Sequence, residues 1–261
     1  MIIDTHAHYD DSRFDEDRES LLQNLLCEGV SNVVNVTAEV KGFDSTLELI
    51  RRYDFMFGTT GVHPDEVGEM TGDTIERMIQ MASDPKIVAV GEIGLDYHHE
   101  DPDKELQKDW FIRQIGVARE TGLPLIIHSR DAAKDTMDIM KQMHTEEIGG
   151  VIHCYSYHAD MALEYVKMGF YIGVGGVVTY KNGVKLQEVV EKIPMERIVL
   201  ETDSPYLTPV PFRGQRNNSA NLRYVAAKIA EIKGISIYDV EDITYRNACA
   251  LYPKMGAALT K

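Results

Sequence analysis

Short apolar runs alternate with longer segments of helical period along this chain, and this rhythm constrains the fold more than any other feature. Most runs are continuously apolar, which is typical of strands covered on both faces. Strands that alternate with helices predict a parallel sheet built from βα units. Eight such runs can be counted: Ile2–Thr5, Asn32–Val36, Met56–Gly61, Ile87–Val90, Leu125–Ile127, Val151–Ile152, Phe170–Val174 and Ile198–Leu200.

Segments of helical period lie between and after these runs: Asp15–Glu28, Thr74–Ser83, Lys104–Thr121, Ala132–Met143, Asp160–Met168, Val184–Lys192, Asn221–Lys233 and Ile237–Tyr252. Gly29, Gly122 and Gly169 follow three of them, as expected for C-terminal caps. The length of 261 residues matches one eight-stranded α/β barrel, which needs about 250 residues. We therefore predict an α/β fold, a (β/α)₈ TIM barrel, with residues 1–261 forming a single domain.

The segment Ser204–Ser219 follows the eighth run and is rich in proline, arginine and asparagine. It is too polar and too broken for a core element, so we predict a long functional loop.

The charge of the chain limits its partners. Acidic residues outnumber basic ones by 42 to 27, giving a net charge of −15, which argues against binding a polyanion through the overall field of the protein. Any contact with nucleic acid must therefore be local.

Three scattered cysteines, Cys27, Cys154 and Cys249, are too few for a disulfide framework. The first residues read MIIDTHAHYD, without the basic and apolar regions of a signal peptide. No apolar run approaches the roughly 18 residues that span a bilayer. We therefore expect a cytoplasmic protein with no membrane contact and no obligate protein partner.

Six side chains suited to metal binding come just after strand-like runs, at the barrel face where this fold builds its active sites. They are His6, His8, Glu92, His128, His153 and Asp203. Taken singly, a histidine at a strand end is more often a hydrogen-bonded structural residue, and an aspartate there is usually the N-cap of the next helix. Six such coincidences on one face are improbable together, and four imidazoles with two carboxylates suit divalent transition metals.

The number of these ligands predicts two ions. Six ligands exceed what one tetrahedral site takes, whereas two ions sharing a carboxylate use them all. His6, His8 and Asp203 are expected to be neighbours, because the first and eighth strands close the barrel. Glu92, on the fourth strand, is the expected bridge to the histidines of the fifth and sixth. Such a pair of ions lowers the pKa of bound water, so the predicted chemistry is hydrolysis.

Several short motifs occur in one order along the chain: His6-Ala7-His8, Gly61-Val62-His63-Pro64, Gly91-Glu92-Ile93-Gly94-Leu95-Asp96, Ile127-His128-Ser129-Arg130, His153-Cys154-Tyr155-Ser156 and Glu201-Thr202-Asp203-Ser204-Pro205. In this order the chain resembles the TatD-like metal-dependent deoxyribonucleases from residue 2 to about residue 252. The resemblance implies a barrel of the metal-dependent hydrolase superfamily, a binuclear site and hydrolysis of phosphodiester bonds in DNA.

Carried over position by position, the resemblance makes the six side chains named above the metal ligands. It also makes Asp203 the proton acceptor for the attacking water, so Asp203 and the bridging Glu92 are the candidate catalytic residues. The implied cofactors are two divalent ions per chain, with Zn²⁺, Mn²⁺, Fe²⁺, Co²⁺ and Mg²⁺ all compatible with this ligand set.

The chain departs from the family pattern at two places. Where the family commonly has a glycine after His-Cys-Phe-Ser, this chain has Tyr157 followed by His158. The late loop, which commonly contains Arg-x-x-x-Asn-Glu-Pro, reads RGQRNNS over residues 213–219. Both departures lie where the substrate is expected, and neither changes a proposed ligand.

Four side chains near the same face are candidates for substrate binding: His63, Arg130, Arg213 and Arg216. His63 can donate to a phosphate oxygen or simply tie down its loop. The arginines can bind phosphates bidentately, although each alone is as often a solvated loop charge. Together with Lys181 they form the locally basic feature through which an acidic protein could hold DNA.

Other residues near these motifs have an ordinary and a functional interpretation. Tyrosines can stack on bases or pack beneath loops, and four are candidates: Tyr97, Tyr155, Tyr157 and Tyr206. Strand geometry directs Cys154 away from His153, so we expect a buried structural thiol. The remaining histidines are expected on the surface: His98, His99, His144 and His158.

DNA is the predicted substrate, as single strands or ends, because a pocket at a barrel mouth admits a flexible strand more easily than a rigid duplex. One alternative keeps the site but changes the substrate, to a small ester or amide or to aminoacyl-tRNA. Another is a non-catalytic metal-binding interaction protein, which the presence of all six ligands disfavours.

Overall fold

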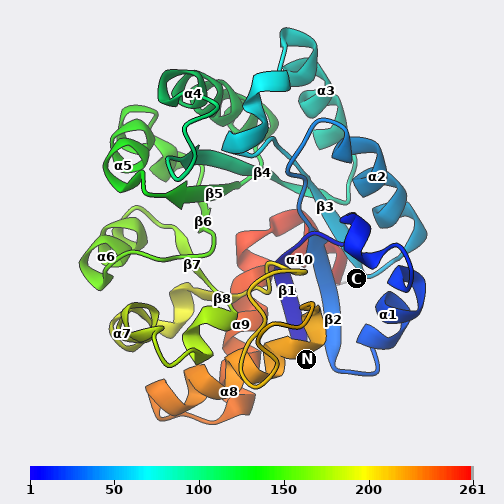
Figure 1. The fold of residues 1–261 in the computed structure, drawn as a ribbon, viewed down its shortest axis with the longest axis vertical. Coiled ribbons are helices and arrows are strands. Elements are labelled where there is room, and N and C mark those ends of the chain that lie inside the picture. The colour runs from blue at the N-terminus through cyan, green and yellow to red at the C-terminus, as the bar shows by residue number, and fades with distance from the viewer. Residues whose placement is uncertain (260–261) are drawn as a thin grey trace.

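The computed structural model describes residues 1–259, and its centre is a sheet of eight parallel strands in sequence order. The strands are β1 (Ile2–Ala7), β2 (Val30–Asn35), β3 (Met56–Thr60), β4 (Ile87–Asp96), β5 (Leu125–Arg130), β6 (Gly150–Ile152), β7 (Tyr171–Val174) and β8 (Ile198–Leu200). The sheet curls into a barrel with helices around its outside (Figure 1). The predicted (β/α)₈ TIM barrel is therefore confirmed.

Ten α-helices accompany the strands: α1 (Arg18–Leu25), α2 (Gly42–Arg52), α3 (Gly72–Ala82), α4 (Lys104–Thr121), α5 (Ala133–Gln142), α6 (Ala159–Lys167), α7 (Val184–Lys192), α8 (Leu222–Lys233), α9 (Ile237–Leu251) and α10 (Pro253–Leu259), all within residues 1–259. Six 3₁₀ helices lie in the connections: η1 (Ser12–Phe14), η2 (Pro64–Glu69), η3 (Thr145–Glu147), η4 (Gly176–Thr179), η5 (Met195–Arg197) and η6 (Ser219–Asn221). None of the helices within residues 1–259 combines the length and the apolar character needed to cross a membrane.

Local chemistry explains where these helices begin and end. The Asp103 side chain caps α4 by accepting from the backbone N–H groups of Glu105 and Leu106, and Gly122 ends the helix in a left-handed conformation. Helix α2 was not among the predicted helices because it begins at Gly42 and has no capping side chain. Its apolar face, with Phe43 and Ile50, is nevertheless buried.

Three strands at the site extend beyond the apolar runs that predicted them. Strand β1 continues to Ala7, β4 to Asp96 and β5 to Arg130, and the ladder between the last two pairs Gly94 with His128. A Cβ atom on Gly94 would collide with the His128 carbonyl oxygen, so this close approach requires glycine. The expectation that His6, Glu92 and His128 follow their strands is therefore wrong, because the strands continue past the apolar residues.

The first and last strands meet differently. Between β1 and β8, a single bridge pairs Ala7 with Ser204. Two backbone hydrogen bonds flank it, from Asp203 N–H to the His6 carbonyl oxygen at 2.9 Å and from His8 N–H to the Ser204 carbonyl oxygen at 2.8 Å. We call this junction the β1–β8 seam. The ladder of β4 with β5 has a register shift between Val90 and Ile93 and then pairs Ile93–Asp96 with Ile127–Arg130, and we call it the β4–β5 seam.

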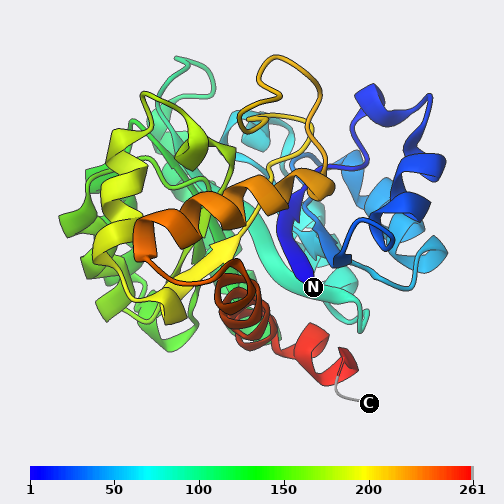
Figure 2. The ribbon, with the colours of Figure 1, turned by 90° about the horizontal axis from the view of Figure 1, so that it is seen from below.

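The two ends of the barrel contrast. The loop over residues 201–218 lies at one end, at the carboxyl ends of the strands, while α9 and α10 cover the opposite end (Figure 2). Inside the barrel, apolar side chains from the strands form a core with residues of these two helices. The contributing residues are Ala248 and Leu251 of α9, Tyr252 between the two helices, and Met255 of α10. The Tyr252 hydroxyl also donates to the Thr5 carbonyl oxygen at 3.1 Å, which connects the segment between α9 and α10 to β1.

Candidate metal centre

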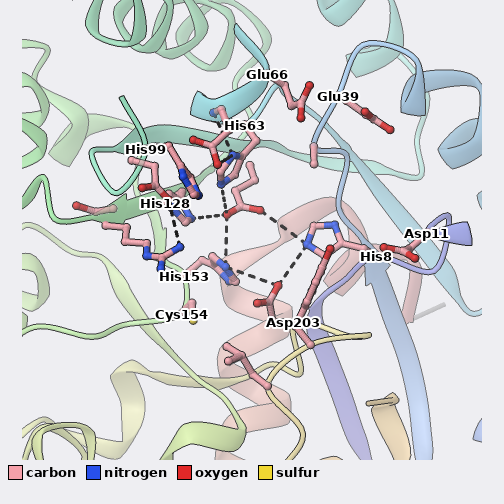
Figure 3. A pocket seen from close by; sticks show the side chains of 18 of the residues that line it. His8, Asp11, Glu39, His63, Glu66, His99, His128, His153, Cys154 and Asp203 are labelled. Atoms are coloured by element: carbon pink, nitrogen blue, oxygen red, sulfur yellow. Dashed lines mark hydrogen bonds and ion pairs between the residues drawn. The ribbon is translucent and has the colours of Figure 1, made fainter. Parts of the chain in front are cut away.

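A cavity of about 1080 Å³ opens at the carboxyl ends of the strands. Figure 3 shows histidine and carboxylate side chains converging in it. Five of the six predicted ligands line the cavity: His8, Glu92, His128, His153 and Asp203. The sixth, His6, lies directly beneath them and is almost completely buried. The structure therefore brings all six side chains together.

Glu92 lies between two groups of histidines. Its Oε2 atom is 3.3 Å from His6 Nε2 and 3.8 Å from His8 Nε2. Its Oε1 atom is 2.7 Å from His128 Nδ1 and 3.4 Å from His153 Nε2. Each oxygen thus faces a different pair of histidines, which is the arrangement of a carboxylate that bridges two cations.

Asp203 completes the group at the β1–β8 seam. Its Oδ1 atom is 3.3 Å from His8 Nε2 and 3.8 Å from His6 Nε2, and it is 3.9 Å from His153 Nε2. The Nε2 atoms of His6 and His8 are only 3.2 Å apart. Three donor atoms from two adjacent strand ends therefore face the same small space.

Contacts at the outer nitrogen of two histidines direct the inner nitrogen toward this space. His8 Nδ1 donates to the Val36 carbonyl oxygen at 2.8 Å. His153 Nδ1 lies 3.3 Å from Glu201 Oε2, close enough for an ion pair although the two atoms form no hydrogen bond. In both, Nε2 points toward the centre, as is typical of metal-binding histidines.

His63 has the opposite tautomer. Its Nδ1 accepts from the Asp65 backbone N–H at 3.2 Å, so the neutral ring carries its proton on Nε2. Burial, together with the neighbouring His128, lowers the pKa of His63 to about 3, which keeps the ring neutral. Because Nε2 points toward Glu92 Oε1 at 3.7 Å, His63 presents a hydrogen-bond donor to the centre rather than a lone pair.

The carboxylates at the centre are ionised. Burial alone would raise the pKa of Glu92, but His153 and His6 lower it well below the usual range. Burial is likewise overcome at Asp203, where His8 and His153 lower the pKa. Two buried negative charges in one cavity require cationic compensation.

In the ion-free chain, protons on two histidines supply part of that compensation. Although burial acts in the opposite direction, Asp203 and Glu92 raise the pKa of His8 to about 9. In the same way Asp96 and Glu92 raise the pKa of His128 to about 10. Binding of divalent ions here must release these protons. The ionised carboxylates and the directed imidazoles therefore fit metal ions.

Three buried carboxylates that the sequence analysis did not select support the ligands. Asp96 Oδ2 lies 3.0 Å from His128 Nε2, and Glu201 accepts from the Cys154 backbone N–H at 2.6 Å in addition to facing His153. Asp96 ends one of the motifs of the sequence analysis and Glu201 begins another. The rule that singled out Glu92, a carboxylate at the end of a buried strand, applies to both of them.

Asp4 is the third supporting carboxylate, and it ties the β1–β8 seam together. Its Oδ1 accepts from the backbone N–H groups of Thr202 at 3.0 Å and His6 at 3.3 Å. Its Oδ2 accepts from the hydroxyls of Thr202 and Ser219, both at 2.6 Å. One fully buried side chain thus links β1, the residue before Asp203 and η6.

The predicted substrate-binding residues divide into two groups. His63 and Arg130 line the cavity. Arg213 and Arg216 are not among its lining residues. The Arg213 guanidinium lies 4.0 Å from the ring centroid of Tyr180, and Arg216 pairs with Asp17 at 2.6 Å. The structure therefore does not bring the two loop arginines together with the metal centre.

Two minor expectations need revision. Cys154 lines the cavity instead of pointing away from it, because its backbone leaves the strand with a φ angle of +45°. His99, expected at the surface, is exposed but also lines the cavity. Figure 3 shows it beside His128, across the cavity from Asp11 and Glu39.

Comparison with known proteins identifies the family of this chain. The sequence model of the TatD related DNases matches residues 3–253. The chain belongs to the TatD related DNase family. The uncharacterized metal-dependent hydrolase YabD of Bacillus subtilis is 40% identical over 97% of this chain and 99% of its own length. YcfH of Escherichia coli, also described as a metal-dependent hydrolase, is 32% identical over 97% of this chain and 96% of its own.

A solved structure extends the likeness to three dimensions. The crystal structure of YjjV, a TatD homologue from Escherichia coli, superposes with a TM-score of 0.91 at 31% sequence identity. The match covers 97% of this chain and 98% of that one. The barrel and its chain order are thus shared within the TatD family, and the chain is a metal-dependent hydrolase of that family.

Proposed function

We propose that this protein hydrolyses phosphodiester bonds of DNA, in single strands or at ends, at a centre that holds two divalent ions. The observation that carries the proposal is the position of Glu92, with one oxygen facing His6 and His8 and the other facing His128 and His153. The DNase description of the family supports DNA as the substrate.

The two groups of donor atoms support a division of the proposed ligands between two positions. His6, His8 and Asp203 would hold one ion at the β1–β8 seam, and His128 and His153 the other, with Glu92 shared by both. Divalent ions so placed supply Lewis acidity to the phosphate and to water. His128 has to give up one of its two carboxylate contacts to bind an ion, because both of its nitrogens are engaged.

Asp203 is proposed to accept the proton of the attacking water. Its low pKa keeps it ionised at neutral pH, and its position at the cavity wall gives it access to solvent. His63 is proposed to donate from Nε2 to a phosphate oxygen, which its tautomer permits. Each of these roles uses a side chain whose protonation state the structure accounts for.

The charges of the cavity wall favour one side for phosphate. Asp11, Glu39 and Glu66 lie along one wall (Figure 3). The cavity is also lined by Lys41, which is paired with Glu39 at 2.8 Å, so the three carboxylates outnumber the cation and disfavour an anion there. Arg130, in contrast, lies at the end of β5 with its side chain half exposed. The proposed phosphate contact within the cavity is therefore Arg130, whereas Arg213 and Arg216 remain proposed contacts for a longer strand outside it.

The decisive experiment assays metal-depleted protein on labelled single-stranded and duplex oligonucleotides and on small esters, with each ion added back in turn. We expect cleavage of single strands that depends on the added ion. Hydrolysis of esters with no cleavage of any oligonucleotide would instead favour the small-substrate hydrolase. Binding of ions without turnover of either substrate would favour the non-catalytic alternative.

Asp203→Asn separates the chemistry from binding. The variant keeps the shape and one oxygen but loses the base, so kcat should fall by about 10²–10⁴-fold while the oligonucleotide still binds. His144→Asn is the control, because His144 is an exposed histidine outside the cavity, and its kcat should not change. A near-normal kcat for Asp203→Asn would contradict the proposed role.

A further inference from the structure

One aromatic side chain is exposed to solvent at the rim of the metal-centre cavity. Tyr206 is 47% exposed and lines the cavity three residues after Asp203. Within residues 1–259 it is the only tyrosine, phenylalanine or tryptophan among the lining residues. An accessible ring beside the proposed catalytic carboxylate is available to contact a bound substrate.

The backbone holds Tyr206 in a fixed relation to the metal centre. Its N–H donates to the Asp203 carbonyl oxygen at 2.8 Å. Its own carbonyl oxygen accepts from the Asn217 side chain, also at 2.8 Å, and Asn217 is fully buried. The exposed ring is therefore carried on a rigid turn rather than on a free loop tip.

The ring itself is braced on one face. The guanidinium carbon of Arg13 lies 4.0 Å from the ring centroid of Tyr206. Asp11 holds that guanidinium with both carboxylate oxygens, at 3.0 Å to Nε and 2.7 Å to a terminal nitrogen. A cation fixed against one face orients the ring, while nearly half of the residue stays accessible.

The other candidate tyrosines are occupied elsewhere. The Tyr97 hydroxyl donates to Asp135 at 2.8 Å, and the Tyr157 hydroxyl lies 3.0 Å from Ser129 Oγ. Tyr155 is buried and donates to the His158 carbonyl oxygen. Their use as packing and hydrogen-bonding residues leaves Tyr206 alone as a surface on which a planar group can stack.

We propose that Tyr206, braced by Arg13, stacks on the nucleobase next to the phosphodiester that is cleaved. This inference rests on the proposed function and specifies how the substrate is held. The ring follows β8, and Arg130 ends β5, which lies across the barrel in the strand order. The base and a phosphate are thus held on opposite sides of the metal centre. A base reaches the ring only when it is unstacked, which selects single strands and frayed ends.

The test combines a protein variant with a substrate that lacks one base. Tyr206→Leu keeps an apolar side chain but removes the ring, and single-stranded oligonucleotides carry one abasic tetrahydrofuran unit at each position flanking the cleaved bond in turn. On the unmodified strand we expect KM to rise by about 5- to 150-fold, the range for loss of one stacked base. At one abasic position, the two proteins should differ by less than about twofold.

Three further variants serve as controls for this interpretation. Tyr206→Phe retains the ring and should keep a near-normal KM, which also shows that the turn still folds. Arg13→Ala removes the brace and should raise KM less than Tyr206→Leu does. Tyr238→Leu removes a ring that is 76% exposed on α9, away from the cavity, and should change nothing.

The outcomes are distinct. A Tyr206→Leu penalty that persists unchanged on every abasic strand would overturn the stacking role while leaving DNA hydrolysis intact, because the wild-type protein would still cleave. Absence of oligonucleotide cleavage by the wild-type protein would overturn the proposed function and the stacking role together. A penalty that disappears at one flanking position supports the proposal and identifies the side of the bond on which the base lies.

Discussion

The two seams that carry the proposed metal ligands hold these side chains in place by different means. At the β4–β5 seam, His128 lies within a backbone ladder that resumes at Ile93, directly after Glu92 and a register shift. At the β1–β8 seam, a single bridge is supplemented by the buried Asp4 carboxylate, which binds groups from three segments of the chain. Backbone pairing and a buried side-chain network are thus alternative ways to hold ligands in place.

This difference predicts which substitutions disrupt the candidate metal centre most. A ladder distributes its hydrogen bonds over many residues, so no single side chain at the β4–β5 seam holds the strands together. The β1–β8 seam depends on one carboxylate, and removal of that carboxylate leaves several buried donors without an acceptor. Substitutions should therefore have unequal effects at the two seams, and the following predictions test this from the largest expected effect to the smallest.

Glu92→Ala should have the largest effect, because Glu92 faces the ligands of both seams. We expect turnover to fall to background and at least one ion per chain to be lost, measured by elemental analysis of the purified protein after dialysis against the ion. A variant that retained two ions and near-normal activity would show that Glu92 does not bridge.

Asp4→Ala should destabilise the protein and weaken the β1–β8 side selectively. The hydroxyls of Thr202 and Ser219 would lose a buried acceptor, and each such loss costs about 1–3 kcal/mol. We expect the free energy of unfolding, from urea titration, to fall by about 2–6 kcal/mol, with one ion bound less tightly than the other.

Two controls accompany the Asp4 variant. Asp4→Asn keeps an acceptor oxygen and should lose less stability, which provides a folded protein if Asp4→Ala proves too unstable. Asp138→Ala breaks an exposed pair with Lys134 at 2.6 Å and should cost less than about 1 kcal/mol. Equal losses for Asp4→Ala and Asp138→Ala would contradict the role of Asp4 in the seam.

Glu201→Gln tests the proposed ligand His153, which lies outside both seams and contacts the Glu201 side chain. Glu201 faces His153 Nδ1 at 3.3 Å and fits its place because Gly173 opposite has no Cβ atom. Loss of the carboxylate should weaken metal affinity by about 10- to 100-fold, measured by competition with a chelator. Unchanged affinity would mean that the ring of His153 is held by packing alone.

Arg130→Ala and Arg216→Ala should have the smallest effects, on binding of oligonucleotides rather than on chemistry. Each lost phosphate contact reduces the slope of log K against log salt by about 0.7 for a single strand. We expect this change for Arg130, which lines the cavity, and a smaller one for Arg216, which is already paired with Asp17. A larger change for Arg216 would place the strand over the late loop instead.

The sequence predicted the barrel and the convergence of the six ligand side chains because both depend on local patterns. Apolar runs predict strands, and the residues after parallel strands share one end of a barrel, so His6 and Glu92 could be placed near each other without any knowledge of side-chain geometry. The exact strand ends were less predictable, because the β4–β5 ladder continues through polar residues.

The supporting network could not be predicted from such patterns. Asp4 contacts Thr202 and Ser219 across 198 and 215 residues of sequence, and nothing local to Asp4 indicates these partners. The same applies to Arg216, whose pairing with Asp17 spans 199 residues. Side chains whose role depends on a distant partner require three-dimensional coordinates, whereas side chains defined by a strand end do not.

The packing of α9 and α10 against the base of the barrel has a consequence for biosynthesis. Residues of α9 and α10 fill the interior core, and Tyr252 bonds to Thr5, which lies 247 positions earlier. A ribosome releases the first strand long before these last helices are made. Strand β1 and its proposed metal ligands therefore cannot reach their final environment until α9 and α10 have been synthesised, so the nascent chain carries these side chains for most of that time without the packing that surrounds them in the fold.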